Sequence, residues 1–279
     1  MFSRLSDSFE EKRALSSFMA GSSIGFFPQQ RESVGVSVKT AILLLGAPGV
    51  GKSTQAACIT QQRANIMCVS TGNLVRKLEK KQREGGVLTD IESAAAESLD
   101  CMRRGELMDD KAVYALLMAH LSPGGEGFEE YSRKDIIILD GVIKAQRNIA
   151  PFEAALRTFN EAIGSMPMNL KHVINISATR HELMSRQRAR VVQAVEEGRA
   201  PRPDDHVDTY RMRLDAYMSK TQEVIDYYKT NHSLIDVDSS QGIKQTTMVL
   251  IDAIDHIDQV LATEAHTDVL GRTGINPLG

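Results

Sequence analysis

The 279-residue sequence has no tryptophan, few aromatic residues and almost no imbalance of charge. Its 33 Lys and Arg residues face 36 Asp and Glu residues, which gives a net charge of −3 at pH 7. A general binder of nucleic acid carries a clear basic excess, so this balance argues against nucleic acid as the main partner. Uninterrupted apolar stretches fall well short of the roughly 20 residues that span a bilayer, so no membrane association is expected.

Cysteine is also scarce. The three cysteines, Cys58, Cys68 and Cys101, cannot all pair with one another, and neither they nor the seven scattered histidines show the spacing of metal ligands. A reduced, cytoplasmic chain with inert thiols is therefore expected. The hydrophobic share of 42% and the charged share of 25% are ordinary for a globular protein, and the length suits one large domain.

Residues 1–38 differ in composition from the rest of the chain, with many serines, several glycines and a short amphipathic pattern. Acidic residues offset the basic ones here, whereas a mitochondrial presequence is rich in Arg and poor in acidic residues. We interpret this segment as an N-terminal extension, either a flexible appendage or an extra docking helix. An atypical targeting segment is the alternative.

From residue 39 onward, short apolar runs alternate with helical patterns. The runs predict strands at 41–45, 66–69, 135–139, 172–176 and 233–237. The helical periodicity predicts helices at about 52–63, 73–84, 88–104, 109–121, 146–160, 179–194, 206–229 and 240–264. This alternation predicts an α/β fold, in which helices cover both faces of a parallel sheet.

Two features lie near the end of this pattern. The predicted helix at 206–229 carries four tyrosines that are expected to pack in the core rather than to stack on a base, namely Tyr210, Tyr217, Tyr227 and Tyr228. Residues 265–279 hold three glycines and one proline and are expected to form a C-terminal tail.

The segment Gly46–Ser53 reads G-A-P-G-V-G-K-S and fits the phosphate-loop pattern G-x-x-x-x-G-K-[ST] without a mismatch. It follows a predicted strand and begins a predicted helix, as this pattern requires. Loop amides and the helix N-terminus attract phosphate, Lys52 adds a charge on the β/γ side, and the Ser53 hydroxyl can ligate Mg²⁺. The ATP-binding residues predicted here are Gly46, Gly49, Val50, Gly51, Lys52, Ser53 and Thr54.

Asp140 directly follows the apolar run at 135–139. In phosphate-loop enzymes a carboxylate at the end of such a strand holds Mg²⁺, directly or through water. We therefore expect Asp140 to be a magnesium ligand, and the alternative is an aspartate that starts a turn before Gly141.

Arginines are concentrated between residues 186 and 213. Arg186 and Arg190 share a helical face because they are four residues apart. Arginines that fold over phosphates stabilise the charge that phosphoryl transfer spreads over oxygen atoms. The functional candidates are Arg186, Arg190, Arg202 and Arg213, whereas Arg188 and Arg199 are expected to lie on a solvated face.

Six motifs, in the same order along the chain, resemble those of the adenylate kinase family of nucleoside monophosphate kinases. The phosphate loop is similar to the family's G-A-P-G-x-G-K-G-T-Q, with Ser53 in place of a glycine. The other motifs are V-S-T-G-N-L-V-R at 69–76, G-E-L-M-D-D at 105–110, L-D-G at 139–141, R-x-x-x-R at 186–190 and R-P-D-D with R-M-R-L at 202–214. They are similar to the family's I-S-T-G-D-x-x-R, G-x-L-V-x-D, D-G-F-P-R, lid-hinge arginine pair and R-x-D-D…R-x-R-L.

The resemblance implies a P-loop NTPase fold with a five-stranded parallel sheet, in a kinase domain that spans residues 39–264. It also implies a helical acceptor-binding insert at 72–106 and a short lid at 187–202. The implied reaction is the reversible transfer of the γ-phosphoryl group of Mg-ATP to a nucleoside monophosphate, with Mg²⁺ as cofactor. The partners would be ATP and the monophosphate, and the chain is expected to be a monomer.

The resemblance also implies roles for single residues. The transferring group would be clamped by Lys52, Arg190, Arg202 and Arg213, with Asp204 holding the lid arginines in place. Arg186 would stack on the adenine of ATP. The monophosphate-binding residues implied by the motifs are Thr71, Arg76, Met108, Lys144, Asn148, Arg202 and Arg213.

The acceptor side departs from the family pattern. Asn73 stands where the family has aspartate, and Val142-Ile143-Lys144 replaces F-P-R. Lys144 keeps the charge of the arginine that grips the acceptor phosphate, but it lacks the guanidinium fork. Asn148 is typical of UMP/CMP kinases, whereas Thr71 is typical of adenylate kinases. These two base-reading signals disagree. AMP is the expected acceptor, and a UMP/CMP-type kinase is the alternative.

Two other classes of protein stay open. The altered segment at 142–144 and the N-terminal extension are compatible with an adenylate-kinase-like protein that binds nucleotides with little or no turnover. A P-loop ATPase, or a kinase for a non-nucleotide acceptor, would instead be indifferent to every nucleoside monophosphate.

Overall fold

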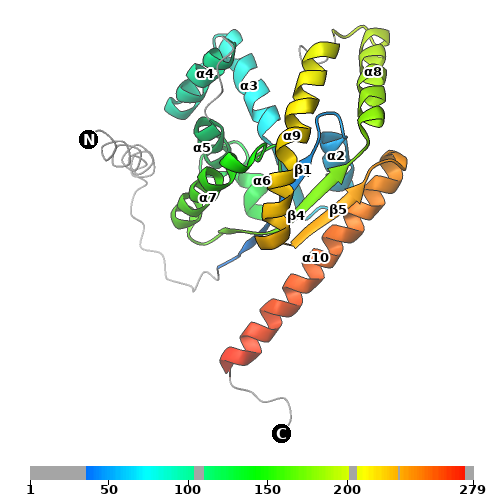
Figure 1. The fold of residues 1–279 in the computed structure, drawn as a ribbon. Coiled ribbons are helices and arrows are strands. Elements are labelled where there is room, and N and C mark those ends of the chain that lie inside the picture. The colour runs from blue at the N-terminus through cyan, green and yellow to red at the C-terminus, as the bar shows by residue number, and fades with distance from the viewer. Residues whose placement is uncertain (1–35, 104–109, 201–205, 232, 274–279) are drawn as a thin grey trace, which may run out of the picture.

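The structure is a computed structural model that describes residues 36–103, 110–200, 206–231 and 233–273. Most of the predicted N-terminal extension therefore lies outside the described residues. The same holds for three predicted site residues, Met108, Arg202 and Asp204. Within the described ranges the chain forms a central sheet with helices packed on both sides (Figure 1), so the predicted α/β class is confirmed.

The sheet contains five strands in the order β2-β3-β1-β4-β5, and every neighbouring pair is parallel. The strands are β1 (Lys39–Gly46), β2 (Ile66–Ser70), β3 (Ile136–Asp140), β4 (Met168–Ser177) and β5 (Ser233–Asp238). The central strand is β1, where Leu43 pairs with Leu139 of β3 and Val173 of β4. The inner strands β1 and β3 are buried on both faces and mainly apolar, which made them clear in the sequence, whereas the edge strand β5 alternates and leaves Asp236 and Asp238 exposed.

Helices connect the strands in the alternating order that the sequence predicts. They are α2 (Lys52–Gln62), α3 (Thr71–Arg83), α4 (Asp90–Arg103), α5 (Asp110–Leu121), α6 (Phe128–Arg133), α7 (Ile149–Ile163), α8 (Arg180–Glu196), α9 (Val207–Asn231) and α10 (Gly242–Thr273), with a 3₁₀ turn η1 (Gln146–Asn148) before α7. The short α6 was not predicted. The last helix was predicted to end near residue 264, but α10 continues to Thr273.

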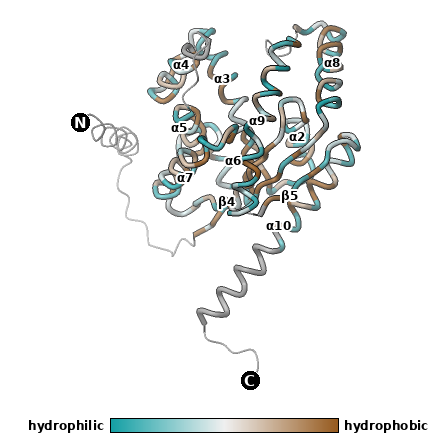
Figure 2. Tube along the Cα trace, viewed as in Figure 1, coloured by the Kyte–Doolittle hydropathy of each residue, from teal (hydrophilic) through white to brown (hydrophobic). Residues whose placement is uncertain are grey.

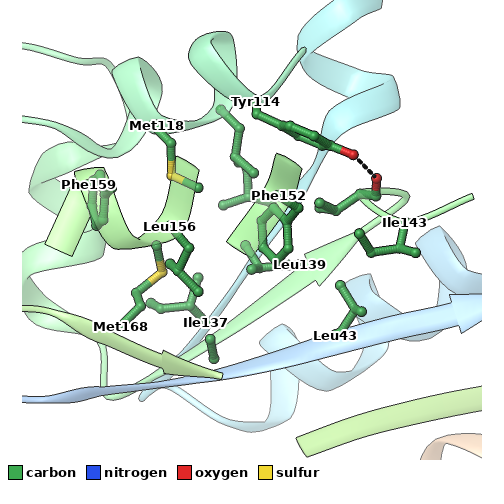
Figure 3. Close-up of a cluster of buried hydrophobic side chains, with 14 of the residues drawn as sticks. Leu43, Tyr114, Met118, Ile137, Leu139, Ile143, Phe152, Leu156, Phe159 and Met168 are labelled. Atoms are coloured by element: carbon green, nitrogen blue, oxygen red, sulfur yellow. Dashed lines mark hydrogen bonds between the residues drawn. The ribbon is translucent and has the colours of Figure 1, made fainter. Parts of the chain in front are cut away.

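Two apolar clusters fill the space between the sheet and the helices (Figure 2). Side chains alternate along β1, so Leu43 faces one cluster while Ile42 and Leu44 face the other. Leu43 lies in the cluster formed with α5 and α7, where Phe152 and Leu156 of α7 pack over the sheet (Figure 3). The opposite cluster joins the sheet to α2, α8, α9 and α10.

The predicted acceptor-binding insert contains α3 and α4. A third apolar cluster packs Leu78 of α3 and Leu99 of α4 against Leu116 of α5, which attaches the insert to the rest of the domain. In the predicted lid at 187–202, the first part is a continuation of α8 as far as Glu196. Among the described residues, none of the helices has the length and apolar character needed to cross a membrane.

Candidate active site

The phosphate-loop segment joins β1 to α2 at the carboxyl edge of the sheet (Figure 1). Gly51 occupies the N-cap of α2 with φ of 105°, a backbone conformation that glycine adopts far more readily than other residues. No side chain caps the first turn of this helix. The first amides of α2 are thus available to an anion, and Ser53 and Thr54 are exposed beside them.

Lys52 folds over the loop that precedes it. Its Nζ donates hydrogen bonds to the carbonyl oxygens of Gly46 at 2.7 Å and Ala47 at 3.2 Å. Burial lowers the pKa of Lys52, the charge of Arg213 lowers that pKa further, and the carboxylate of Asp140 opposes both effects. The structure therefore brings Arg213 and Asp140 within electrostatic range of Lys52, although they come from distant parts of the sequence.

Asp140 ends β3 and is only 4% exposed. Among the described residues no donor reaches its Oδ1, and a buried carboxylate oxygen is costly unless a donor or cation compensates it. This orphaned oxygen fits a magnesium site. No cluster of three or more His, Cys, Asp or Glu residues capable of holding a metal occurs in the described ranges. The predicted ligands Ser53 and Asp140 would hold Mg²⁺ together with water and phosphate oxygens, since this cation keeps several waters when it binds between carboxylates and phosphates.

The arginines of α8 differ in their surroundings. Arg186 donates through Nη1 to the carbonyl oxygen of Val50 and to Ser239 Oγ, both at 3.0 Å, and through Nη2 to the Ser239 carbonyl oxygen at 2.6 Å. It thus links α8 to the phosphate loop and to the segment after β5. Arg190 follows one turn later and is half-buried, whereas Arg188 is exposed, as expected for a solvated face.

Two predicted acceptor residues lie at the start of α3. Thr71 is buried and donates from Oγ1 to the carbonyl oxygen of Gly141 at 2.9 Å, so it holds the loop that leaves β3. Arg76 is exposed and donates from Nη2 to Asn73 Oδ1. The residue that departs from the family's aspartate is therefore the hydrogen-bond partner of the predicted phosphate-binding arginine.

Lys144 lies in the loop that follows β3. Its pKa is lowered, first by desolvation and then by the charge of Arg213, while Asp110 and Asp140 act in the opposite direction. Because Arg213 lowers the pKa of both Lys52 and Lys144, these three cations converge on one region. Cations converge in this way at sites that bind polyanions, and phosphate groups would relieve their mutual repulsion.

Asn148, a predicted base-reading residue, is buried and engaged with its own chain. Its Oδ1 accepts from the backbone amides of Lys144 at 3.1 Å and Ala145 at 2.8 Å, and its Nδ2 donates to Asp110 Oδ2. In this arrangement Asn148 holds the loop that carries Lys144, and its amide is turned toward Asp110.

Two residues near the site, Tyr114 and Tyr210, were not predicted to act there, and Asp110 was predicted only as part of the motif at 105–110. The hydroxyl of Tyr114 of α5 is 3.3 Å from the carbonyl oxygens of both Val142 and Asn148 and shares its one proton between them, which supports the acceptor loop. Asp110 accepts from Asn148, and Tyr210 of α9 reaches the phosphate loop. Tyr210 was expected only to pack, and no spacing rule in the sequence indicates a contact across 162 residues.

Comparison with known proteins supports membership of the adenylate kinase family. A family model described as "Adenylate kinase" matches residues 44–233. The chain is 29% identical over 214 residues to an adenylate kinase of Jannaschia sp., which covers 77% of this chain and 98% of the relative. It is 30% identical over 234 residues to one of Dehalococcoides mccartyi, with coverage of 76% and 97%. The phosphate loop, the converging cations and these matches together show that the chain belongs to the adenylate kinase family and is a nucleoside monophosphate kinase.

Proposed function

We propose that the protein transfers the γ-phosphoryl group of Mg-ATP reversibly to AMP, which yields two molecules of ADP. The observation that carries this proposal is the convergence of Lys52 and Arg213 with Lys144 beside Asp140. These residues come from the phosphate loop, from α9 and from the loop that follows β3. Their meeting point is where the donor and acceptor phosphates would have to face each other.

The proposed reaction needs positioning and charge stabilisation rather than a protein nucleophile. A phosphate oxygen of AMP attacks the γ-phosphorus, and the bond from that phosphorus to the β–γ bridging oxygen breaks. Lys52 exchanges its carbonyl partners for phosphate oxygens, while Arg190 and Arg213 stabilise the charge on the transferring group. Mg²⁺, held by Ser53 and Asp140, would neutralise further phosphate charge. Arg202 and Asp204 remain proposed parts of this clamp.

On the acceptor side, we assign the phosphate of AMP to Arg76 and Lys144. Arg76 is exposed at the start of α3, and Lys144 stands in the loop that Asn148 and Tyr114 hold. Thr71, which is adenylate-like, supports AMP as the acceptor, and Met108 is the proposed base contact. Since Asn148 is engaged by Asp110, it reads the base only if this hydrogen bond opens.

The test is a panel of acceptors. Purified protein with Mg-ATP is incubated with AMP, dAMP, CMP, UMP or GMP, and the nucleotides are separated by chromatography. The highest kcat/KM is expected with AMP, and EDTA should abolish transfer. A higher value with CMP or UMP would identify a UMP/CMP-type kinase. ATP hydrolysis at one rate with every acceptor would identify a P-loop ATPase or a kinase of another acceptor.

A second candidate is a nucleotide-binding protein with little turnover. Lys144 favours it, since an ammonium group cannot grip a phosphate with two parallel hydrogen bonds as a guanidinium does. Titration calorimetry with ATP distinguishes this candidate from the first. Tight binding of ATP without diphosphate formation from any monophosphate would establish binding alone and contradict the proposed transfer.

A further inference from the structure

The hydroxyl group of Tyr210 lies between the phosphate loop and helix α8. It is 2.8 Å from the carbonyl oxygen of Pro48 and 3.2 Å from that of Leu183. The side chain is 1% exposed, so its position is fixed by packing against α8 and the loop. A phenol has one proton to donate, and the shorter distance assigns it mainly to Pro48.

A hydrogen bond to the Pro48 carbonyl also fixes the amide that follows it. The C=O of Pro48 and the N–H of Gly49 belong to one planar peptide unit, and in a trans unit they point in opposite directions. Within the described residues all peptide bonds are trans. While Tyr210 holds this carbonyl on the outside of the loop, the Gly49 amide faces away from Tyr210, toward the inside, where phosphate binds.

Arg186 acts on the loop in the same way, since its bond to the Val50 carbonyl at 3.0 Å orients the N–H of Gly51. Two carbonyls of the loop, those of Pro48 and Val50, are thus held by donors from two different helices, α9 and α8. Tyr210 also precedes Arg213 by one turn of α9, and Leu183 precedes Arg186 by one turn of α8. The phenol therefore stands at the junction of the loop with both helices that carry the arginines.

The Tyr210 hydroxyl leaves no room for a side chain at Gly49. A Cβ atom at Gly49 would lie 2.5 Å from the Tyr210 hydroxyl oxygen, which is far too close, and φ of Gly49 is +78°. The glycine is thus required by the loop conformation and by the presence of the hydroxyl. If the hydroxyl were removed, the nearest ring atom would be 3.3 Å from the added methyl group, which is a tight but tolerable contact.

We infer that Tyr210 is a positioning residue for ATP, because its hydroxyl orients the peptide unit between Pro48 and Gly49 and fixes the arginine-bearing helices α8 and α9 against the phosphate loop. The inference deepens the proposed function. Its kinetic test depends on that function, whereas its binding test does not. It assigns to the phenol a role in the donor site and none in the acceptor site.

The test compares Tyr210→Phe with the matched control Tyr217→Phe. Tyr217 is a partly buried tyrosine two turns further along α9, packed against the same apolar cluster. Tyr210→Phe should weaken the binding of a non-hydrolysable ATP analogue, measured by calorimetry, about 5- to 20-fold, as the loss of one hydrogen bond predicts. It should raise KM for ATP but leave KM for AMP nearly unchanged. The melting temperature should fall by a few degrees, because buried carbonyl oxygens lose their donor. Tyr217→Phe should match the wild type.

Unchanged affinity for the analogue in Tyr210→Phe would overturn the inference, and so would an equal rise in the KM values of ATP and AMP. Calorimetry needs no turnover. A wild-type protein that binds the analogue and transfers nothing would therefore refute the proposed function, while the binding comparison would still decide the role of Tyr210.

A double-mutant cycle tests the match between Gly49 and the phenol. Gly49→Ala should raise the Kd of the ATP analogue when Tyr210 is present. In the Tyr210→Phe background the same substitution should raise that Kd by a factor about 5-fold smaller. The strain from φ remains in both backgrounds, so the difference isolates the contact with the hydroxyl. Strictly additive effects would show that Gly49 and the hydroxyl are independent and would contradict the inference.

Discussion

The ammonium group of Lys52 donates a hydrogen bond to the carbonyl oxygen of Gly46, the first residue of the same phosphate loop, at 2.7 Å. The contact holds the charged end of the side chain over the loop. Burial and the nearby charge of Arg213 both favour the neutral amine, so the lysine gains when phosphate oxygens replace the carbonyl. The donor site is therefore built around a cation that a phosphate can stabilise.

Lys52→Met should abolish most of the activity without unfolding the protein. The change removes the ammonium group that stabilises the negative charge on the transferring phosphoryl group. It should lower kcat at least about 100-fold, the usual effect of deleting one preorganised stabilising group. Steady-state kinetics measure the rate, and circular dichroism with a thermal melt measures the fold. Lys220→Met, which replaces an exposed lysine on α9, is the matched control. A rate within a few-fold of the wild type would remove Lys52 from the mechanism.

The acceptor site should weaken as the pH rises. The pKa of Lys144 lies below the ordinary value of 10.5, because desolvation and Arg213 disfavour its charged form. Below that lowered pKa the amine is charged, and above it the charge is lost, at a pH where a lysine with the ordinary pKa would still carry it. KM for AMP should therefore rise from neutral pH toward about pH 10.

Lys144→Arg tests the cause of that rise, because a guanidinium stays charged throughout this pH range. The alkaline increase in KM for AMP should disappear in this variant, and the fork should lower KM at neutral pH. Steady-state profiles at saturating Mg-ATP measure both effects, with Lys220→Arg as the control. An alkaline limb that survives Lys144→Arg unchanged would assign the titration to another group.

Asn148→Ala should destabilise the protein. The buried amide accepts from the backbone amides of Lys144 and Ala145 and donates to Asp110, so its removal leaves three partly buried polar groups without this partner. The free energy of unfolding should fall by about 2 kcal/mol, measured with urea. Gln222→Ala removes an exposed amide on α9 and should change stability by less than about 0.5 kcal/mol. Equal small effects would mean that Asn148 does not hold the loop.

Cys68 should resist alkylation in the folded protein. Desolvation, reinforced by the charges of Asp140 and Glu130, raises the pKa of this thiol to about 12. The reactive thiolate is then almost absent near pH 8. Iodoacetamide followed by peptide mass spectrometry should label Cys68 only after the chain is unfolded in denaturant. Rapid labelling of the native protein at Cys68 would show that β2 opens or that the thiol is not shielded.

The elements that sequence analysis located well are those with a strong local signal. The β3 segment is a run of apolar β-branched residues, and the phosphate loop has a fixed pattern of glycines, so both were predicted nearly to the residue. The six-residue helix α6 follows a glycine-rich loop and is too short to show a clear period, so it was missed. The order of strands, with β3 between β1 and β2, depends on contacts that local patterns do not contain.

The candidate site was predicted unevenly for the same reason. Lys52 and Asp140 follow from motifs, and the structure brings them into electrostatic contact. The hydrogen bond from Asn148 to Asp110 and the bond from Tyr210 to Pro48 join segments that are far apart in the sequence. Whether an amide points toward a base or toward a neighbouring carboxylate is decided by packing in three dimensions, so residue type and spacing could not reveal it.

The bond from Thr71 to Gly141 fastens the first residue of α3 to the loop that leaves β3. If α3 swings over the acceptor, this bond makes Thr71 the natural pivot, and the apolar contact between Leu78 and Leu116 of α5 would have to shift. Arg76 lies about 8 Å from this pivot and Arg83 about 18 Å, at 1.5 Å per residue. The backbone at Arg76 would thus move through less than half the arc of the far end of the helix, so the proposed phosphate-binding arginine would be displaced least when the insert moves.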